Sequence, residues 1–461
     1  MKSDVLNATA EFEVEQTVKK SRRSVARILE EDLWHQGIVP YEIEGIFNGS
    51  ECKMIKQAMR EWEKSTCLKF VPKIENQHKK YLVFTKSDVG CYTSFGNEHR
   101  KSSIGMNCKC MKFGTILHEL GHAIGLYHEH VRPDRDHYIE IHYHRVLTSR
   151  RHNFYEIPRD EVKIFGEYDF DSIMHYPENA FSIQNNETVI EPKVKINGKT
   201  PIIGQRSYLS KNDIAGINYL YKCPRCGGTL SEAQGIFSPP SKLNGSEVGF
   251  EYCQWIIRAA QGERIKLVIA LLDIRKTSNC STDYLEIRNG YQTNSTVLGH
   301  YCGDVESATI ITNNFVTVKF ARSQFENHRP GFILEYKAVC GGDIYLESDD
   351  TYYLESPNYP ESYEPNKLCH WNIRAPYKHY IVIEFSYFEL EESTGCKNDF
   401  LEVREAGSEG APIIGSYCGK KDRLDIAAIM DRIVLTFVTN EMKEAGGFSA
   451  AISAISQYQY Q

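Results

Sequence analysis

The stretch Thr115-Ile-Leu-His-Glu-Leu-Gly-His-Ala-Ile-Gly-Leu-Tyr-His-Glu-His130 is the most informative part of the chain. His118 and His122 are four residues apart, so a helix places both imidazoles on one face, one turn apart. Gly125 supplies the backbone freedom for a sharp turn that ends such a helix. This turn allows His128 to reach the same point in space as a third imidazole. The spacing therefore predicts a site of three histidines.

Three imidazole ligands with an open fourth position are typical of a catalytic zinc site, so we expect one zinc ion per chain. Zinc in such a site makes water acidic enough to act as a nucleophile near neutral pH. Glu119 lies beside the ligands and is placed to take the proton of that water and to deliver it to a departing amine. A five-residue HExxH motif also arises by chance in helices, but the longer spacing that includes Gly125 and His128 argues against chance.

Two further segments resemble the astacin family of metzincin zinc proteases. They are His128-Glu-His-Val-Arg-Pro-Asp-Arg-Asp136 and Ser172-Ile-Met-His-Tyr176. The resemblance implies an α+β metzincin-type protease domain, in which Met174 of the Met-turn forms an apolar floor beneath the zinc. It also implies that Tyr176 ligates zinc at rest and later hydrogen-bonds the transition state; the alternative is a buried aromatic side chain. Glu129 matches the family residue that the newly freed N-terminus contacts, as in activation of a zymogen.

Within that family the chain resembles the tolloid, or procollagen C-proteinase, group. The matching segments are Gly166–Met174, Ile203–Arg206 and Tyr221–Leu230. The resemblance implies that Arg206 lines the pocket for the residue after the scissile bond and favours aspartate there; an exposed arginine is the alternative. The chain departs from tolloids because it has no EGF modules and has Gly90-Cys91-Tyr where tolloids carry a cysteine-rich loop.

An internal repeat occupies the C-terminal half. Matching segments are offset by 116 residues, as in 369 − 253 for the two Cys-x-Trp motifs and 417 − 301 for the two Tyr-Cys-Gly motifs. Short alternating stretches such as Arg264–Ile269 read as strands of an all-β sandwich. The copies, 226–338 and 340–456, resemble CUB domains, a family used in protein recognition. The expected fold is therefore multidomain: an α+β metzincin-type protease domain over 24–223, followed by two all-β CUB sandwiches.

Many CUB domains bind calcium through an acidic cluster, and the two copies differ at the matching positions. In the first copy the acidic position is taken by Arg275, which would repel a cation. In the second copy Glu391 and Asp399 match, although Asn440 stands at the last acidic position. We therefore expect that calcium binds, if at all, in the second copy; the alternative is two solvated surface carboxylates.

Fourteen cysteines, an even number, predict a disulfide framework made in an oxidising compartment. The repeat suggests bridges between neighbouring cysteines in each copy, although one copy alone leaves their connectivity open. The astacin resemblance implies two bridges in the protease domain, and the remaining two cysteines form a pair by arithmetic. The expected pairs are Cys226–Cys253, Cys280–Cys302, Cys340–Cys369, Cys396–Cys418, Cys67–Cys223, Cys91–Cys110 and Cys52–Cys108.

Charge and hydropathy limit the partners and the location. The net charge of −7 argues against a nucleic-acid binder, and no stretch is apolar enough to span a membrane. Residues 1–20 lack the apolar core of a signal peptide, so secretion is inferred from the cysteines, the motifs and four Asn-x-Ser/Thr sequons. The basic run Lys19–Arg23 predicts proprotein-convertase cleavage after Arg23, with 1–23 as a propeptide remnant. The sequons are at Asn48, Asn186, Asn244 and Asn294.

Three functions are compatible with these features. The first is a secreted tolloid-like protease that processes extracellular matrix precursors or growth-factor antagonists, with the CUB copies docking extracellular protein substrates. The second is a hatching-type astacin protease that degrades egg envelopes. The third is a non-catalytic binding protein, which the intact His118, Glu119, His122, His128 and Tyr176 argue against. Arg206 and the Tyr221–Leu230 junction favour the first.

Overall fold

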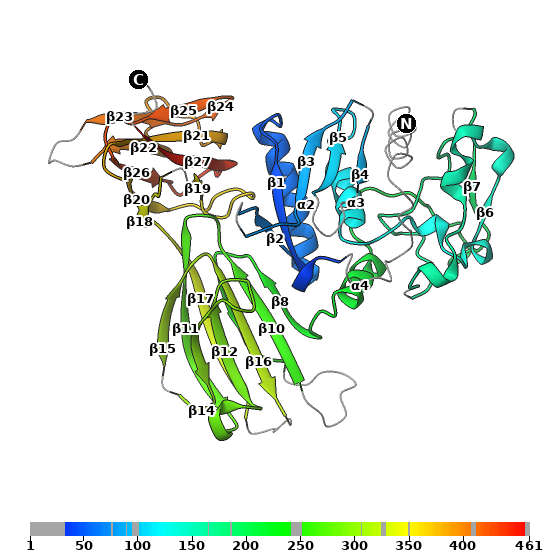
Figure 1. Ribbon diagram of the computed structural model, residues 1–461, viewed down its shortest axis with the longest axis horizontal. Helices are drawn as coiled ribbons and strands as arrows, with labels where there is room; N and C mark the ends of the chain where they lie inside the picture. Colours follow the sequence, from blue (N-terminus) through cyan, green and yellow to red (C-terminus); the bar gives the residue numbers. More distant parts are fainter. Residues whose placement is uncertain are drawn as a thin grey trace. The chain divides into compact units, whose positions relative to one another are not determined.

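The structure is a computed structural model of the chain (Figure 1). It describes residues 33–74, 77–88, 90–94, 101–164, 166–184, 187–240, 251–305, 307–323, 329–348, 351–406 and 412–456. The chain divides into two compact units: one ends at Cys223 and the other begins at Pro224, with the short segment Asn48–Lys53 grouped with the second. The segment 1–23, the predicted cleavage site after Arg23 and the sequons at Asn186 and Asn244 lie outside the described residues.

A five-stranded sheet in the order β2-β1-β3-β5-β4 forms one part of the first unit (Figure 1). Its first four strands are parallel, whereas β4 at the end of the order runs antiparallel to β5. Branched and aromatic residues such as Val39, Phe70, Phe84 and Ile104 are fully buried in it, as expected for a covered parallel sheet. The strands are β1 (Ile38–Ile43), β2 (Lys69–Pro72), β3 (Leu82–Lys86), β4 (Tyr92–Ser94) and β5 (Ser102–Met106).

Among the residues that the structure describes, three α-helices complete the framework of this unit. They are α2 (Gly49–Ser65), α3 (Phe113–Ala123) and α4 (Lys211–Leu220). The fully buried Trp62 of α2 donates its indole N–H to the carbonyl of Leu117 in α3, at 3.1 Å, so the two helices are joined by a polar bond as well as by packing. Ser210 and Asp213 form a reciprocal capping box that begins α4.

The chain between α3 and α4 is mostly irregular and contains short elements. A two-stranded antiparallel pair joins β6 (Ile139–Ile141) to β7 (Ile190–Pro192), and it packs with a small apolar core that includes Phe154, Tyr176 and Phe181. Short 3-10 helices of the first unit are His35–Gly37, Glu129–Val131, Arg135–His137, Tyr143–Arg145, Thr148–Phe154 and Arg159–Glu161.

The predicted histidine helix and its end are confirmed. Helix α3 carries His118 and His122, and it ends at Ala123. Gly125 then adopts a φ of 113°, a conformation that side-chain-bearing residues rarely take, and its N–H donates to the carbonyl of His122. The chain reverses at this point and brings His128 back toward the helix.

The second unit contains two β-sandwiches of the same topology, which confirms the repeat and the predicted fold class. One sheet of the first sandwich has the order β13-β12-β16-β10-β8, and the matching sheet of the second is β23-β22-β26-β20-β18. The opposite sheets are β14-β11-β17-β9, with β15 on β11, and β24-β21-β27-β19, with β25 on β21.

Each sandwich has its own core between its two sheets. In the first, Trp255 meets Phe332 edge to face; in the second, Trp371 meets Phe448 in the same way. The strands of the first are β8 (Cys226–Leu230), β9 (Gln234–Phe237), β10 (Glu251–Arg258), β11 (Glu263–Ile274), β12 (Tyr284–Asn289), β13 (Thr296–Tyr301), β14 (Gly303–Asp304), β15 (Ala308–Thr312), β16 (Phe315–Arg322) and β17 (Gly331–Cys340), with a 3-10 turn at Ser278–Cys280. Those of the second are β18 (Gly342–Tyr345), β19 (Thr351–Glu355), β20 (Leu368–Arg374), β21 (His379–Glu389), β22 (Phe400–Glu405), β23 (Ile413–Tyr417), β24 (Lys420–Lys421), β25 (Leu424–Ala427), β26 (Arg432–Val438) and β27 (Gly447–Ser456).

Six of the seven predicted disulfides are present. They are Cys67–Cys223, Cys91–Cys110, Cys226–Cys253, Cys280–Cys302, Cys340–Cys369 and Cys396–Cys418. The seventh prediction, Cys52–Cys108, is wrong: neither cysteine forms a disulfide. Cys52 lies in the first turn of α2 and Cys108 in an exposed turn before α3, and pairing by arithmetic took no account of where the fold puts them.

Candidate active site

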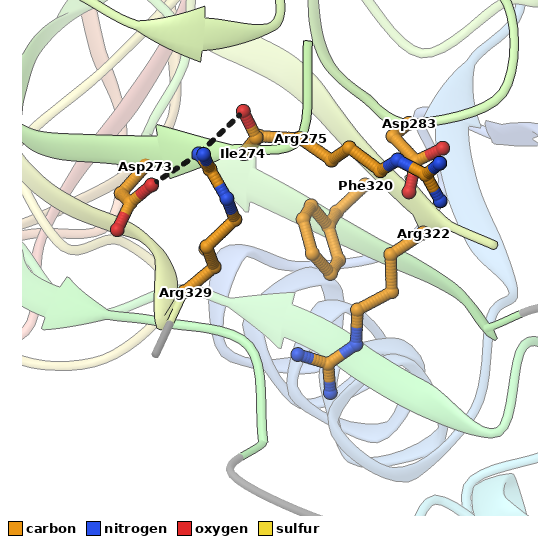
Figure 2. A pocket seen from close by; sticks show the side chains of 8 residues that line it. Asp273, Ile274, Arg275, Asp283, Phe320, Arg322 and Arg329 are labelled. Carbon is orange, nitrogen blue, oxygen red and sulfur yellow. Dashed lines mark hydrogen bonds and ion pairs between the residues drawn. The ribbon is translucent and has the colours of Figure 1, made fainter. Parts of the chain in front are cut away.

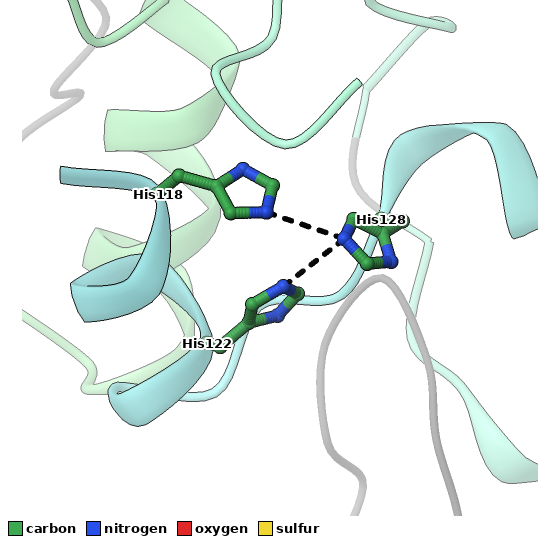
Figure 3. Close-up of side chains that lie close together, drawn as sticks. All are labelled: His118, His122 and His128. Carbon is green, nitrogen blue, oxygen red and sulfur yellow. Dashed lines mark hydrogen bonds between the residues drawn. The ribbon is translucent and has the colours of Figure 1, made fainter. Parts of the chain in front are cut away.

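The three predicted histidines converge at one point (Figure 3). The Nε2 atom of His128 lies 3.2 Å from Nε2 of His118 and 3.2 Å from Nε2 of His122. Two of the rings come from one face of α3, and the third comes from the segment that follows the turn at Gly125. His118 and His122 are buried, and His128 is partly exposed, so the cluster meets solvent on one side.

The surroundings of the rings fit a metal ion. The Nδ1 atom of His118 lies 2.8 Å from the carbonyl oxygen of Ile173, and Nδ1 of His122 lies 2.9 Å from the carbonyl oxygen of Leu126. A carbonyl accepts only, so we assign the ring proton to Nδ1 and leave the Nε2 lone pair directed at the cluster. Burial holds the pKa of His118 well below its usual range, which keeps that ring neutral. The Nε2 atoms of His118 and His122 each lie 3.2 Å from Nε2 of His128. Neutral imidazole nitrogens gathered in this way are ligands that zinc binds in proteins.

The Met-turn lies directly against the histidine helix. Ile173 supplies the carbonyl that orients His118, and Met174 is buried beside it. A Cβ atom placed on Gly121 would lie only 2.6 Å from Sδ of Met174, so the thioether packs against the bare backbone of α3 between His118 and His122. Ser172 and Asp213 hold this turn: the Ser172 hydroxyl and the Ile173 N–H both donate to the Asp213 carboxylate, at 2.7 and 2.9 Å.

Tyr176 lies next to the cluster, where the family resemblance placed it. Its ring centroid is 4.3 Å from that of His128, and its side chain is only 2% exposed. The ring of Tyr176 also stacks on the buried ring of His130, with centroids 4.0 Å apart and the planes inclined by 27°. His130 was quoted in the sequence only as part of a motif; its stacking depends on the path of the chain after His128.

Glu119 is fully buried on α3, adjacent to His118. The hydroxyl of Thr93, in β4, donates to Oε2 of Glu119 at 2.6 Å. The sequence analysis did not single out Thr93. The two residues are 26 positions apart, and no short motif joins them.

Glu129 is buried and already has a cationic neighbour. Its Oε1 accepts from Nη1 of Arg132 at 2.8 Å and from the backbone N–H of Asp169 at 2.9 Å. Burial raises the pKa of Glu129 to about 7, although Arg132 acts in the opposite direction. A pocket beside it is lined by residues that include three carboxylates, those of Glu129, Asp169 and Asp213. Arg132, which stands in the quoted motif, is the partner that the sequence analysis missed.

Arg206 lies on the loop that precedes α4, and it is half-buried rather than freely exposed. Its Nη1 donates to the carbonyls of His175 and Gln205, at 3.0 and 2.8 Å. Its backbone approaches the first turn of α3 so closely that a Cβ on Gly114 would lie 1.7 Å from the Arg206 carbonyl oxygen. The guanidinium is therefore held next to the residue that precedes Tyr176, within the same region as the histidines.

The two CUB-like sandwiches differ at the candidate calcium positions. In the second, Asn440 joins both predicted carboxylates: its side-chain N–H donates to Glu391 Oε2 at 2.9 Å, and its backbone N–H donates to Asp399 Oδ1 at 2.7 Å. The other oxygen of Asp399 accepts from the hydroxyl of Tyr363 at 2.6 Å. The structure therefore brings Glu391 and Asp399 together.

In the first sandwich the corresponding place is a pocket lined by charged residues of both signs (Figure 2). Figure 2 shows the side chain of Arg275 extending toward the buried Asp283, and Arg329 donating to Asp273 at 2.7 Å. Asp283 also accepts from the N–H and the hydroxyl of Ser323. Cationic side chains thus already occupy this pocket.

A helical HExxH segment, a third histidine after a glycine turn and a methionine turn beneath them together define a zinc metalloprotease of the metzincin type. The model of the astacin peptidase family matches residues 26–222, and the CUB domain model matches 226–336 and 340–452. The chain therefore belongs to the astacin family of zinc metalloendopeptidases, and it carries two CUB domains.

Several curated proteins are similar to most of the chain. Bone morphogenetic protein 1 of Xenopus laevis is 39% identical over 91% of this chain and 59% of its own length. Tolloid-like protein 1 of Homo sapiens is 40% identical over 91% of this chain and 41% of its own. The chain thus spans about two fifths to three fifths of the length of these relatives. Among solved structures, the hatching enzyme zinc-protease high choriolytic enzyme 1 of Oryzias latipes is 33% identical over 41% of this chain and 93% of its own, with a TM-score of 0.37.

Two further observations concern the disulfides and the helices. The six disulfides, spread over all three domains, fit an oxidising compartment. Among the residues that the structure describes, no helix is long and apolar enough to cross a membrane.

Proposed function

We propose that this chain is a secreted, tolloid-like endopeptidase that processes extracellular matrix precursors or growth-factor antagonists. The observation that carries the catalytic part is the histidine cluster, in which carbonyls at Nδ1 of His118 and His122 leave Nε2 atoms directed at one point beside Glu119. Resemblance to tolloid-like relatives over most of the chain supports the choice of substrate class.

His118, His122 and His128 would hold the zinc ion, and Glu119 would act as the general base. A bound zinc supplies Lewis acidity, which makes water more acidic and polarises a peptide carbonyl. Glu119 takes a proton from the attacking water as the new C–O bond forms, and it then passes that proton to the amine nitrogen as the C–N bond breaks. Full burial of Glu119 strengthens these proton transfers because bulk water does not compete for the carboxylate.

Tyr176 would donate a hydrogen bond to the oxygen that gains negative charge in the transition state. Its place beside His128 and its stacking on His130 support this role, because they hold the ring at the edge of the cluster. A donor that acts on the transition state raises kcat more than it lowers KM.

Activation by cleavage near Arg23 would place a new N-terminal ammonium in the pocket beside Glu129. The carboxylates of Glu129, Asp169 and Asp213 line that pocket; burial raises the pKa of each because it disfavours their negative charge, and an ammonium among them would offset that cost through charge pairing. A protein whose N-terminus is extended by a few residues before Ser24 should lose activity, whereas the correctly cleaved protein should be active. Full activity of the extended form would exclude this mechanism.

Arg206 would favour aspartate after the scissile bond. Its guanidinium is held by the carbonyl of His175, next to Tyr176 and the histidine cluster, and a cation in that region supports recognition of a substrate carboxylate. The Arg206→Gln variant should lose a preference for aspartate in a peptide library while it still cleaves other sequences. The same profiling separates a processing protease with a narrow preference from a hatching-type protease that degrades egg-envelope proteins.

The CUB domains would dock the protein substrate, and the second would bind calcium near Glu391 and Asp399. The meeting of these two carboxylates at Asn440 supports this site, and the arginines in the first domain argue that it binds no calcium. Calcium titration should then find one ion per chain. Asp399→Asn should abolish that binding, whereas Asp283→Asn should leave it unchanged.

The decisive test of the catalytic proposal is the Glu119→Gln variant of the processed protein. It should retain zinc and bind substrate, yet lose turnover by several orders of magnitude; a chelator should abolish wild-type activity, and added zinc should restore it. Turnover of the variant at the wild-type rate would refute the assignment.

A further inference from the structure

The strand β4 contacts the buried carboxylate of the histidine helix through one side chain. Thr93 is the central residue of β4, whose antiparallel register with β5 pairs it with Ile104. Its hydroxyl oxygen lies 2.6 Å from Oε2 of Glu119 and 3.0 Å from the backbone carbonyl oxygen of the same residue. Both contacts are to the residue that the proposed function makes the general base.

The hydroxyl has one hydrogen, and the shorter contact is to the carboxylate. A hydroxyl that donates to an ionised carboxylate makes a charge-assisted bond, which is short and roughly twice as strong as a neutral one. The last torsion of a glutamate side chain has a broad energy profile, so the chain itself does not set the plane of the carboxylate. A partner on a neighbouring element can set it.

We infer that Thr93 is a positioning residue for proton transfer: it holds Oε2 of Glu119, so that the other carboxylate oxygen is the one presented to the attacking water. This inference rests on the proposed role of Glu119. The water proton moves to that oxygen as the water oxygen bonds to the carbonyl carbon, and it leaves with the amine when the C–N bond breaks. Oε2 keeps its bond from Thr93 throughout.

Two substitutions separate the hydroxyl from the shape of the side chain. Thr93→Val keeps the branched shape and removes the donor, whereas Thr93→Ser keeps the donor and removes a methyl group. The neighbouring Ser94 provides a matched control, since its hydroxyl bonds within the sheet to that of Ser103 in β5, at 2.7 Å.

With a peptide substrate, Thr93→Val should lower kcat about 10- to 100-fold, the range expected for loss of a hydrogen bond to a charged group. Its KM and its zinc content should stay within about twofold of wild type. Thr93→Ser should recover most of kcat, and Ser94→Ala should leave both constants unchanged. A kcat that stays at the wild-type value in Thr93→Val, or that falls equally in Thr93→Ser, would overturn the inference.

Two more measurements distinguish this positioning role from that of a simple structural tether between β4 and α3. In a Glu119→Gln background, Thr93→Val should cause no further loss of the residual rate, because its effect passes through that carboxylate. A phosphinic peptide mimics the tetrahedral state. Its affinity should be weaker for Thr93→Val than for wild type, whereas the Thr93→Val/Glu119→Gln double variant should bind it as well as Glu119→Gln alone. Additive losses in either measurement would indicate a structural tether.

Failure of this inference can be told from failure of the proposed function. If Glu119→Gln is inactive and Thr93→Val is fully active, only the role of Thr93 is wrong. If Glu119→Gln retains wild-type turnover, the general-base assignment itself is wrong. Near-UV circular dichroism of each variant checks that the protease domain is folded, and Thr93→Ser keeps the test valid if Thr93→Val unfolds.

Discussion

Replacement of Gly114 by alanine tests whether helix propensity or a tertiary contact determines which residue the first turn of α3 can accept. Gly114 is buried in α3, and a Cβ there would lie 1.7 Å from the carbonyl oxygen of Arg206, 2.3 Å from its carbonyl carbon and 2.9 Å from its Cα. Real Cβ contacts are rarely shorter than 3.0 Å, so the two backbones must separate by at least 3.0 − 1.7 = 1.3 Å. The atoms in the way are backbone, which has no rotamer to change.

Two opposing free-energy effects set the size of the result. Alanine is favoured over glycine inside a helix by about 0.8–1 kcal/mol. Forcing an extra carbon into a packed interior costs about 1–3 kcal/mol, and occasionally more. The difference between the two effects runs from about 1 − 1 = 0 to about 3 − 0.8 = 2.2 kcal/mol, so we expect Gly114→Ala to be destabilised by up to about 2 kcal/mol, which for a domain of this size lowers Tm by up to about 8 °C. The displaced loop should also weaken any preference that Arg206 confers.

Thermal unfolding of the zinc-loaded protein and cleavage of a peptide library measure these two effects. Gly45→Ala is the control, because Gly45 is exposed in the same unit and a Cβ built there meets no atom within 4 Å beyond its chain neighbours. This control should change Tm less and should leave the cleavage profile unchanged. A Gly114→Ala protein with a raised Tm and a wild-type profile would show that propensity decides, and would refute the reasoning.

Three other predictions follow from single groups. Burial raises the pKa of Glu263 from 4.5 to about 7, so between these pH values the folded first CUB domain keeps a proton that the unfolded chain has lost. The free energy of unfolding of this domain should therefore fall as pH rises from about 4.5 to 7, by an amount on the order of 3 kcal/mol. Glu263→Gln should remove that fall in unfolding experiments at about pH 5 and about pH 8; an unchanged slope would contradict it. Tyr176→Phe should lower kcat about 10²- to 10³-fold with little change in KM, and a change confined to KM would argue against a transition-state role. Joint replacement of Cys67 and Cys223 by serine opens a loop with a sequence separation of 156 and should lower the free energy of unfolding, measured with denaturant, by about 4–5 kcal/mol. A loss below about 1 kcal/mol would show that opening the loop gives the unfolded chain little extra conformational freedom.

Features that depend on local spacing could be predicted from the sequence. The convergence of His118, His122 and His128 follows from a helical period and a glycine turn, because all three lie within eleven consecutive residues. The presence of two like sandwiches follows from a constant offset of 116 residues, since two copies of one pattern must fold alike, whereas the repeat only suggested how the cysteines of each copy pair. Met174 and Tyr176 required the family resemblance, because no spacing links them to the histidines.

The contacts that orient the catalytic groups could not be predicted in this way. Pairing of Cys52 with Cys108 failed because arithmetic assumes that every cysteine takes part in a disulfide, whereas the structure contains no bridge at either residue. The Arg132 partner of Glu129 was visible in a motif, but only the fold shows that both groups are buried together.

By itself, the sequence determined the domain repeat and predicted which residues are the candidate metal ligands and the candidate general base, since these depend on chemistry and on short-range geometry. Only the tertiary structure decided which atoms hold those groups in place: Ile173 and Leu126 on the imidazoles, Thr93 on Glu119, and the Arg206 loop on Gly114. The reason is that each of these contacts, except that of Leu126, joins segments far apart in the chain. Such contacts are set by strand register and packing, which no local pattern of residues encodes.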